Sequence, residues 1–452
     1  MPVSKHQEKV PDRIAEYIQL IAQGTVAEVQ EKLKELHPAE IAHIIEALPL
    51  VERDALWELV HPTDEGDILI RLNDEVRTRF IDAMSESELI AATKGLEIDD
   101  LVDILSDYPE EVIQRLLQSM DKDYRLRLEA VMSYPEDTAG GLMNTDAITV
   151  RADISLDVVL RYLRLHGEIP ETTDNLIVIN REGHYLGTLA LTDLLTKDPS
   201  LSVAEIINRE VDPIQANTDV KEVASLFEKL DLVSAPVVDE QNKLIGRITI
   251  DDVVDVIREE GEHSLMSMAG LREEEDMFAP VVASSRRRTV WLGVNLLTAL
   301  LASWVISNFD QTIEKIVALA ILMPIVASMG GIAGSQTLTL VIRGIALGQV
   351  GRSNAWRLIN KEILVGLLNG LIWAIVVSII SYLWFDDVGL GVIIAAAMLL
   401  NLIVAAIAGA AIPIFLHKIG VDPALAGGVL VTTVTDVIGF LAFLGLAALY
   451  LI

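Results

Sequence analysis

The apolar residues of this chain follow three patterns that divide it into three regions. From residue 10 to 133 they recur with a helical period that breaks at short intervals, without the alternation typical of strands. From residue 144 to 260 short apolar runs alternate with helical stretches. After residue 286 the apolar stretches reach about 20 residues, the length that a helix needs to cross a bilayer. The chain is therefore expected to be mainly α-helical, with an α/β region between a small superhelical array of helices and a membrane domain.

Five stretches are long enough to span a membrane, at 290–309, 316–342, 362–385, 389–416 and 424–452. The gaps that precede them contain three, one, four, zero and one lysine or arginine residues in turn. Because basic residues collect on the cytosolic side, the region before the first span is placed in the cytosol and the C-terminus outside. The first residues carry charge and no apolar segment typical of a signal peptide, which agrees with a cytosolic head. The pattern predicts a multi-pass protein of the plasma membrane, in contact with its lipids.

Charge separates the head from the membrane domain. The 452 residues hold 35 basic and 66 acidic side chains, and the first 285 hold 26 and 59 of these, a net charge of −33. A head this acidic excludes nucleic acid as a partner, and it is tolerated if the acids are solvated or bound by cations. The chain has no cysteine, which excludes disulfides and thiolate metal sites. It shows no nucleophile–base constellation or phosphate-binding loop, so an enzyme is not expected.

The α/β region contains a duplication with a spacing of 59 residues. In the first copy, the apolar run Asn175–Asn180 is followed by Gly187–Asp193. In the second copy, Ser234–Asp239 is followed by Gly246–Asp252. Each copy is expected to form a helix, two short strands joined by a turn, and a second helix that starts at the acid.

This duplicated pattern resembles a tandem pair of cystathionine-β-synthase-type (CBS) domains, which dimerise and often bind adenine nucleotides. In that family a glycine, the threonine three residues later and the aspartate three residues after that surround a ribose. Gly246, Thr249 and Asp252 fit this pattern, whereas the first copy has Ala190 at the hydroxyl position. The resemblance implies that a nucleotide such as ATP would bind in the second copy only, through Thr249 and Asp252.

Two acidic patterns in the head are candidate cation sites. Asp99 and Asp103 lie four residues apart on one helix face, where like charges repel. A bridging cation would relieve that repulsion, and a solvated pair is the alternative. Asp251, Asp255 and Glu259 form a stripe with the same spacing on the helix that connects the duplication to the membrane domain. Acids on this connecting helix are placed to sense cations and to transmit the result.

Asp436 is the acid that the pattern places in the interior of a span, the fifth, with no basic residue inside a span to pair with it. An ionisable group in the membrane is by default a functional-site hypothesis. Thr432 and Thr433 precede it by four and three residues, so their hydroxyl groups share its helix face. Carboxylate and hydroxyl oxygens suit a hydrated Mg²⁺ ion, and a protonated aspartic acid hydrogen-bonded between helices is the structural alternative. Since five helices are few to enclose a pore, a homodimer with two copies of Asp436 near one axis is expected.

Three motifs resemble the MgtE family of magnesium channels. They are Glu136–Met143 at the start of the duplication, Gly420–Ala424 before the last span and Thr435–Gly439 within it. The order of helical domain, CBS pair, connecting helix and five spans also matches that family over the whole chain. The resemblance implies an acidic helical domain at 1–135, tandem CBS domains at 136–258, a connecting "plug" helix with a linker at 251–285, and a transmembrane domain at 286–452.

The family forms homodimers that admit Mg²⁺ down its electrochemical gradient, and cytosolic Mg²⁺ bound between the acidic domains and the plug helices closes the pore. Asp436 matches its pore acid. Many relatives have asparagine where this chain has Ile332 and Ser335, which removes those amides from pore hydration. The sensor positions that the resemblance assigns are Asp99, Asp103, Asp252, Asp255 and Glu260.

Two other classes of function stay open from the sequence. The chain would be a proton- or sodium-coupled exporter of divalent cations if Asp436 were a relay carboxylate, or a nucleotide-sensing receptor if nothing were transported. Mg²⁺, Co²⁺ and Mn²⁺ all accept oxygen ligands, so the residues do not select among them.

Overall fold

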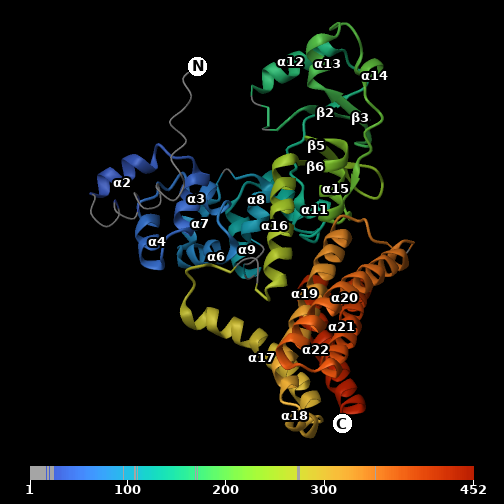
Figure 1. Ribbon diagram of the computed structural model, residues 1–452. Coiled ribbons are helices and arrows are strands. Elements are labelled where there is room, and N and C mark those ends of the chain that lie inside the picture. The colour runs from blue at the N-terminus through green and yellow to red at the C-terminus, as the bar shows by residue number, and fades with distance from the viewer. Residues whose placement is uncertain are drawn as a thin grey trace, which may run out of the picture. The chain divides into compact units, whose positions relative to one another are not determined.

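The computed structural model describes residues 25–94, 96–105, 108, 110–167, 169–170, 172–271, 275–351 and 353–452, together with Tyr17 and Leu20. The chain folds into two compact units (Figure 1). The first comprises Met1–Gly261 and Glu274–Ala279, and the second comprises Glu262–Glu273 and Pro280–Ile452. Each unit is described by itself.

Short helices open the first unit and pack around one apolar core. Polar caps begin several of them; Thr25 and Ser85, for example, each form a capping box with the glutamate three residues later. The predicted helical array is confirmed. Its helices are α2 (Val26–Leu33), α3 (Pro38–Glu46), α4 (Leu50–Trp57), α5 (Glu65–Leu69), α6 (Asp74–Ala83), α7 (Glu86–Ala92), α8 (Ile98–Leu105), α9 (Glu110–Ser119) and α10 (Lys122–Val131).

Two small sheets of identical topology follow the helical array. In each, the first strand pairs parallel with the second, and the second pairs antiparallel with the third. Asn175 pairs with Ala190 in one sheet and Ser234 pairs with Thr249 in the other, so the duplication at 59 residues is also a duplication of register. The strands are β1 (Thr149–Arg151), β2 (Asn175–Ile179), β3 (Tyr185–Ala190), β4 (Ile214–Gln215), β5 (Ser234–Val238) and β6 (Leu244–Thr249), and the helices are α11 (Ala139–Leu142), α12 (Leu156–His166), α13 (Leu191–Thr196), α14 (Val203–Ile206) and α15 (Val220–Leu230).

A single helix, α16 (Ile250–Met268), leaves the second sheet and carries the acids of the connecting segment. The long apolar helices follow it, and five of them have the length and composition to cross a membrane, as predicted. α21 packs against α19, α20 and α22, and it is the most buried of the five (Figure 1). These helices are α17 (Val281–Ser307), α19 (Ala318–Ala346), α20 (Ala355–Phe385), α21 (Val388–Lys418) and α22 (Pro423–Tyr450), with the short α18 (Asp310–Lys315) after the first.

Two membrane helices begin earlier than their apolar stretches. α17 starts at Val281, so the three arginines at 286–288 lie within its first turns and not before it. α20 starts at Ala355, which places Glu362 inside the helix, where its side chain is buried. Helical hydrogen bonding continues through polar residues, whereas an apolar count stops at them.

The segment 275–279, between α16 and α17, is held by the helical array of the first unit. Arg53 of α4 is fully buried and donates through Nη1 and Nη2 to the two carboxylate oxygens of Asp276, at 2.7 and 3.0 Å. The backbone N–H of Asp276 donates to Glu75 Oε2 at 3.0 Å, and the N–H of Phe278 donates to Asp276 Oδ1 at 3.0 Å. We call Arg53, Glu75, Asp276 and Phe278 the linker clamp.

Candidate functional site

Asp436 lies in an open groove between α19 and α22. The groove encloses about 760 Å³, and Thr432, one turn before Asp436, lines it from the same helix. Facing them on α19 are the side chains of Ser328, Ser335 and Gln336. Ser335 and Gln336 interrupt the apolar second span in the sequence. In the structure they therefore face the carboxylate of Asp436 in the fifth span. Ala327, Gly331, Ile332 and Thr339 complete the lining. We call this the Asp436 groove.

The two predicted threonines differ in their relation to this groove. Thr432 lines it, whereas Thr433 is not among its lining residues. Both hydroxyls donate to a carbonyl one turn back, Thr432 to Gly428 at 2.9 Å and Thr433 to Val429 at 2.6 Å. A hydroxyl that donates in this way keeps its oxygen lone pairs for an acceptor role. Only the oxygen of Thr432 is thereby offered to the groove beside Asp436.

A second acid, Glu362, lies inside a membrane helix; it is the first residue of the predicted stretch 362–385 and was not singled out there as an acid within a span. Its side chain is 3% exposed, and its Oε2 accepts a hydrogen bond from the hydroxyl of Thr337 on α19 at 3.3 Å. Lys361 contacts Oε1 at 2.5 Å. Thr337 is buried and does not line the Asp436 groove. The position of Glu362 at the edge of its apolar stretch is the signal that could have marked it as a residue of the helix.

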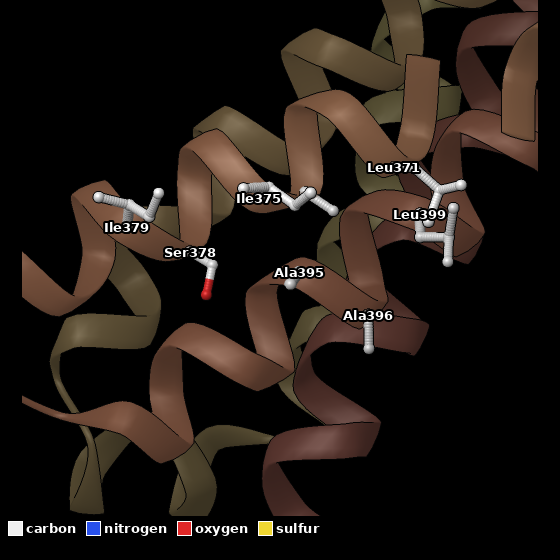
Figure 2. A pocket seen from close by; sticks show the side chains of 8 residues that line it. Leu371, Ile375, Ser378, Ile379, Ala395, Ala396 and Leu399 are labelled. Carbon is white, nitrogen blue, oxygen red and sulfur yellow. The ribbon is translucent and has the colours of Figure 1, made fainter. Parts of the chain in front are cut away.

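Another groove of the second unit lies between α20 and α21 and encloses about 360 Å³. Figure 2 shows Ile375, Ser378 and Ile379 of α20 facing Ala395 and Leu399 of α21. Ser378 is the only polar residue of its lining. This surface suits lipid chains, and it offers nothing that would hold a cation.

In the first unit, the acidic side chains of α8 lie against those at the start of α16. Asp99 is buried, and its Oδ1 has no hydrogen-bond partner within the described part of the chain. Burial and the nearby carboxylate of Asp252 raise the pKa of Asp99 far above its ordinary value. Burial and the adjacent Asp251 likewise raise the pKa of Asp252. Two predicted sensor residues from separate regions of the sequence, Asp99 buried and Asp252 half-buried, are thus brought close enough to repel each other.

Asp103 of α8, one turn after Asp99, is within electrostatic reach of Glu259 of α16, two turns after Asp252. Desolvation by neighbouring atoms and the charges of Asp100, Glu259 and Glu136 together raise the pKa of Asp103 to about 7, against the opposing effect of Arg77, although the residue keeps an exposed edge. Burial also raises the pKa of Asp100 to about 6. Two acids of the predicted stripe, Asp251 and Glu259, are thus within electrostatic reach of the acids of α8.

The other two predicted sensor residues of α16 have cationic neighbours instead. Asp255 lies 3.2 Å from Arg258, and Glu260 lies 2.7 Å from Lys221 of α15. Glu259, which the resemblance does not name as a sensor residue, is the acid of α16 within electrostatic reach of Asp103. Among the residues that the structure describes, no three acidic or histidine side chains come close enough to form a ready-made metal site.

The residues predicted to bind a nucleotide are hydrogen-bonded to each other. The hydroxyl of Thr249 donates to Asp252 Oδ2 at 3.0 Å and to Asp251 Oδ1 at 2.5 Å, and its backbone N–H donates to Asp252 Oδ2 at 3.2 Å. Thr249 is 6% exposed. Asp252 therefore serves two predicted sites, the sensor pair with Asp99 and the ribose position beside Thr249.

Several parts of the chain match models of known protein families. Residues 323–446 match a family described as "Divalent cation transporter", MgtE. Residues 36–137 match the MgtE intracellular N domain, and residues 139–199 and 203–259 each match a CBS domain.

Similar proteins cover almost the whole chain. A protein of Thermus thermophilus named "Magnesium transporter MgtE" is 31% identical over 450 residues, 98% of this chain and 99% of that protein. Its namesake in Bacillus subtilis is 30% identical over 438 residues, 97% of each chain. A solved structure of the cytosolic domain of the Mg²⁺ channel MgtE with ATP is 32% identical, covers 54% of this chain and 99% of that one, and has a TM-score of 0.49. The two full-length relatives and the family models confirm the resemblance drawn from the motifs, and this chain belongs to the MgtE family of divalent cation transporters.

Proposed function

We propose that this protein admits Mg²⁺ to the cytosol down its electrochemical gradient, and that the ion passes through the Asp436 groove. The observation that carries the proposal is a single groove lined by the Asp436 carboxylate, the Thr432 hydroxyl and the polar side chains of α19. A water molecule takes roughly 30 Å³ in the liquid, so Mg²⁺ with six waters needs on the order of 200 Å³. The groove of about 760 Å³ accommodates that hydrated ion. Mg²⁺ gives up its waters reluctantly, and a carboxylate that binds through them suits its passage.

The same groove supports a homodimer. It is open along one side, and one protomer offers a single carboxylate. A second copy related by a two-fold axis would close that side and add a second Asp436. We place the C-terminus outside the cell and the head in the cytosol, in line with the distribution of basic residues. Chemical labelling of a cysteine added after Ile452 tests this orientation, because the native chain has no cysteine.

Cytosolic Mg²⁺ is proposed to close the pore by binding between α8 and α16. The support is the pair of buried Asp99 and half-buried Asp252; the unpartnered oxygen of Asp99 and the repulsion within the pair fit a hard cation with oxygen ligands. Asp103 and Glu259 add two further acids within electrostatic reach of each other, one turn along α8 and two turns along α16. Without Mg²⁺ these carboxylates repel and the array separates from α16. With Mg²⁺ the shared ion holds the two together. Asp255 and Glu260 would join the site only after leaving Arg258 and Lys221.

ATP is proposed as a ligand of the second CBS unit. Its ribose hydroxyls would replace the hydrogen bond between Thr249 and Asp252. Because Asp252 also faces Asp99, the same carboxylate would take part in both nucleotide binding and Mg²⁺ sensing. Calorimetric titration of ATP into the purified protein, with Thr249→Ala as the test and Thr188→Ala in the first copy as the control, decides this point.

The experiment that tests the main proposal is Mg²⁺ flux into liposomes holding the parent or Asp436→Ala. Flux that needs only a Mg²⁺ gradient and is lost in the variant supports the proposal. Flux that requires a proton or sodium gradient indicates a coupled exporter instead. Flux that is unchanged in Asp436→Ala removes the groove from the pathway. Loss of inhibition by internal Mg²⁺ in Asp99→Asn, with full flux, supports the sensor.

A further inference from the structure

Asn401 of α21 is a polar side chain buried at the centre of the membrane helices. It is 0% exposed. Its Nδ2 donates to the carbonyl of Val326 on α19 at 2.9 Å. Its Oδ1 is buried and has no hydrogen-bond partner among the described residues. A buried amide that leaves one polar atom unsatisfied destabilises a helix bundle relative to an apolar side chain of similar size, so a role in packing alone does not explain it.

The amide lies against two glycines, one on each helix that forms the Asp436 groove. A Cβ atom added to Gly330 of α19 would lie 2.2 Å from Asn401 Nδ2. A Cβ added to Gly439 of α22 would lie 2.7 Å from the same atom. Both distances are far shorter than van der Waals contact, so neither helix carries a side chain at these points and both backbones rest directly on the amide.

These contacts are next to the lining of the groove. Val326, whose carbonyl the amide holds, is followed by Ala327 and Ser328, which line the groove. Gly330 precedes the lining residue Gly331, and Gly439 comes three residues after Asp436. One side chain thus fixes the backbone of both groove walls within a turn of the residues that face the ion.

We propose that Asn401 is a positioning residue that sets the separation of α19 and α22, and hence the width of the Asp436 groove and its selectivity among hydrated divalent cations. The inference rests on the proposed function, because it takes the groove as the ion pathway. Asn401 does not touch the ion. It acts through Val326, Gly330 and Gly439.

The test is suppression of one substitution by another. Gly330→Ala puts a methyl group against the amide, and flux per reconstituted protein is expected to fall about tenfold or more, as for other overpacked interfaces. Asn401→Ala removes the obstacle, so the double variant Gly330→Ala/Asn401→Ala is expected to conduct within about threefold of Asn401→Ala alone. Gly428→Ala on α22 is the matched control, because nothing lies within 4 Å of a Cβ built there.

Selectivity supplies a readout that a purely structural residue would leave unchanged. Asn401→Ala is expected to alter the ratio of Co²⁺ to Mg²⁺ flux at least threefold. Ser381→Ala, which shortens another fully buried side chain with an unpartnered oxygen, is expected to keep the parent ratio. If Gly330→Ala does not fold, recovery of a monodisperse dimer in the double variant tests the same contact.

The outcomes separate this inference from the proposed function. If Asp436→Ala abolishes flux but Asn401→Ala neither rescues Gly330→Ala nor changes the flux ratio, the positioning role is wrong and the pathway stands. If Asp436→Ala conducts like the parent, the pathway itself is wrong, and the inference falls with it. Rescue together with an altered ratio supports both.

Discussion

Replacing Arg53 by alanine is expected to release the segment 275–279 from the helical array. The guanidinium makes four hydrogen bonds, two to the Asp276 carboxylate at 2.7 and 3.0 Å, one to the carbonyl of Ile45 at 3.0 Å and one to that of Glu46 at 3.2 Å. Burial alone would raise the pKa of Asp276, but the hydrogen bonds from Arg53 and the Phe278 N–H hold it below its ordinary value. Within the docked segment, Asp276 therefore stays charged because Arg53 and the Phe278 N–H offset the effect of burial.

The size of the expected effect depends on what happens to the Asp276 carboxylate once Arg53 is removed. Leaving one partner of a buried ion pair without the other destabilises the docked state by about 3–5 kcal/mol. Because Asp276 lies on a connecting segment, its carboxylate can move into water when Arg53 is absent. The penalty then appears as a loss of docking of the segment 275–279 onto the helical array. A shift of 3 kcal/mol corresponds to about 100-fold in the docked-to-undocked ratio.

Hydrogen exchange of the peptide that contains Asp276 and Phe278 measures this ratio directly in the full-length protein. Exchange of their amides is expected to rise about 100-fold in Arg53→Ala. The exposed pair Arg151 and Asp153, with side chains 48% and 51% exposed, is the control, and its removal should change exchange less than about fivefold. Equal effects of Arg53→Ala and Arg151→Ala would refute the view that the clamp holds the segment.

Three further predictions concern the groove, the sensor and the buried membrane acid. Thr432→Val should lower Mg²⁺ flux about tenfold and Thr433→Val less than twofold, since one hydroxyl lines the groove and the other does not; equal effects contradict the assignment. Because the pKa of Asp103 is raised to about 7 in the folded head, the fold binds its proton more tightly than the unfolded chain does, and its stability falls as pH rises through that value. In Mg²⁺-free buffer, resistance of the head to protease should thus decrease from about pH 5 to about pH 8, and Asp103→Asn should make the profile less steep, with Asp100 and Asp252 accounting for the remaining slope. Glu362→Ala should destabilise the purified protein by about 1–3 kcal/mol in thermal unfolding, whereas the exposed Glu314→Ala should leave it unchanged.

Local patterns in the sequence were sufficient for the features that depend on neighbours along the chain. The five apolar stretches, the 59-residue duplication and the position of Asp436 on one face with Thr432 all follow from spacing. The polar residues of the second span were visible in the sequence as an interruption of the apolar stretch. The sequence did not show which residues they face, because helix–helix contacts are set by packing across the bundle.

Features that join distant parts of the chain lay beyond the sequence. Glu259 and Glu260 are adjacent, and only the direction of α8 decides which of the two faces Asp103. In the sequence, Asn401 is a polar residue within an apolar helix. Only the structure shows that its side chain lies against Gly330 and Gly439. Periodicity carries no signal for such pairings.

The linker clamp also constrains the order in which the protein is built. Arg53 and Asp276 are separated by 223 positions in the chain, and a growing chain folds its N-terminal domain first. The helical array must therefore form around a buried guanidinium whose counter-ion has not yet been synthesised. Asp276 leaves the ribosome only five residues ahead of Val281, where the first membrane helix begins. Completion of the cytosolic head and insertion of the first span are thus consecutive events of biosynthesis, and a truncated array made without residues 275–279 would keep an unpaired charge in its core.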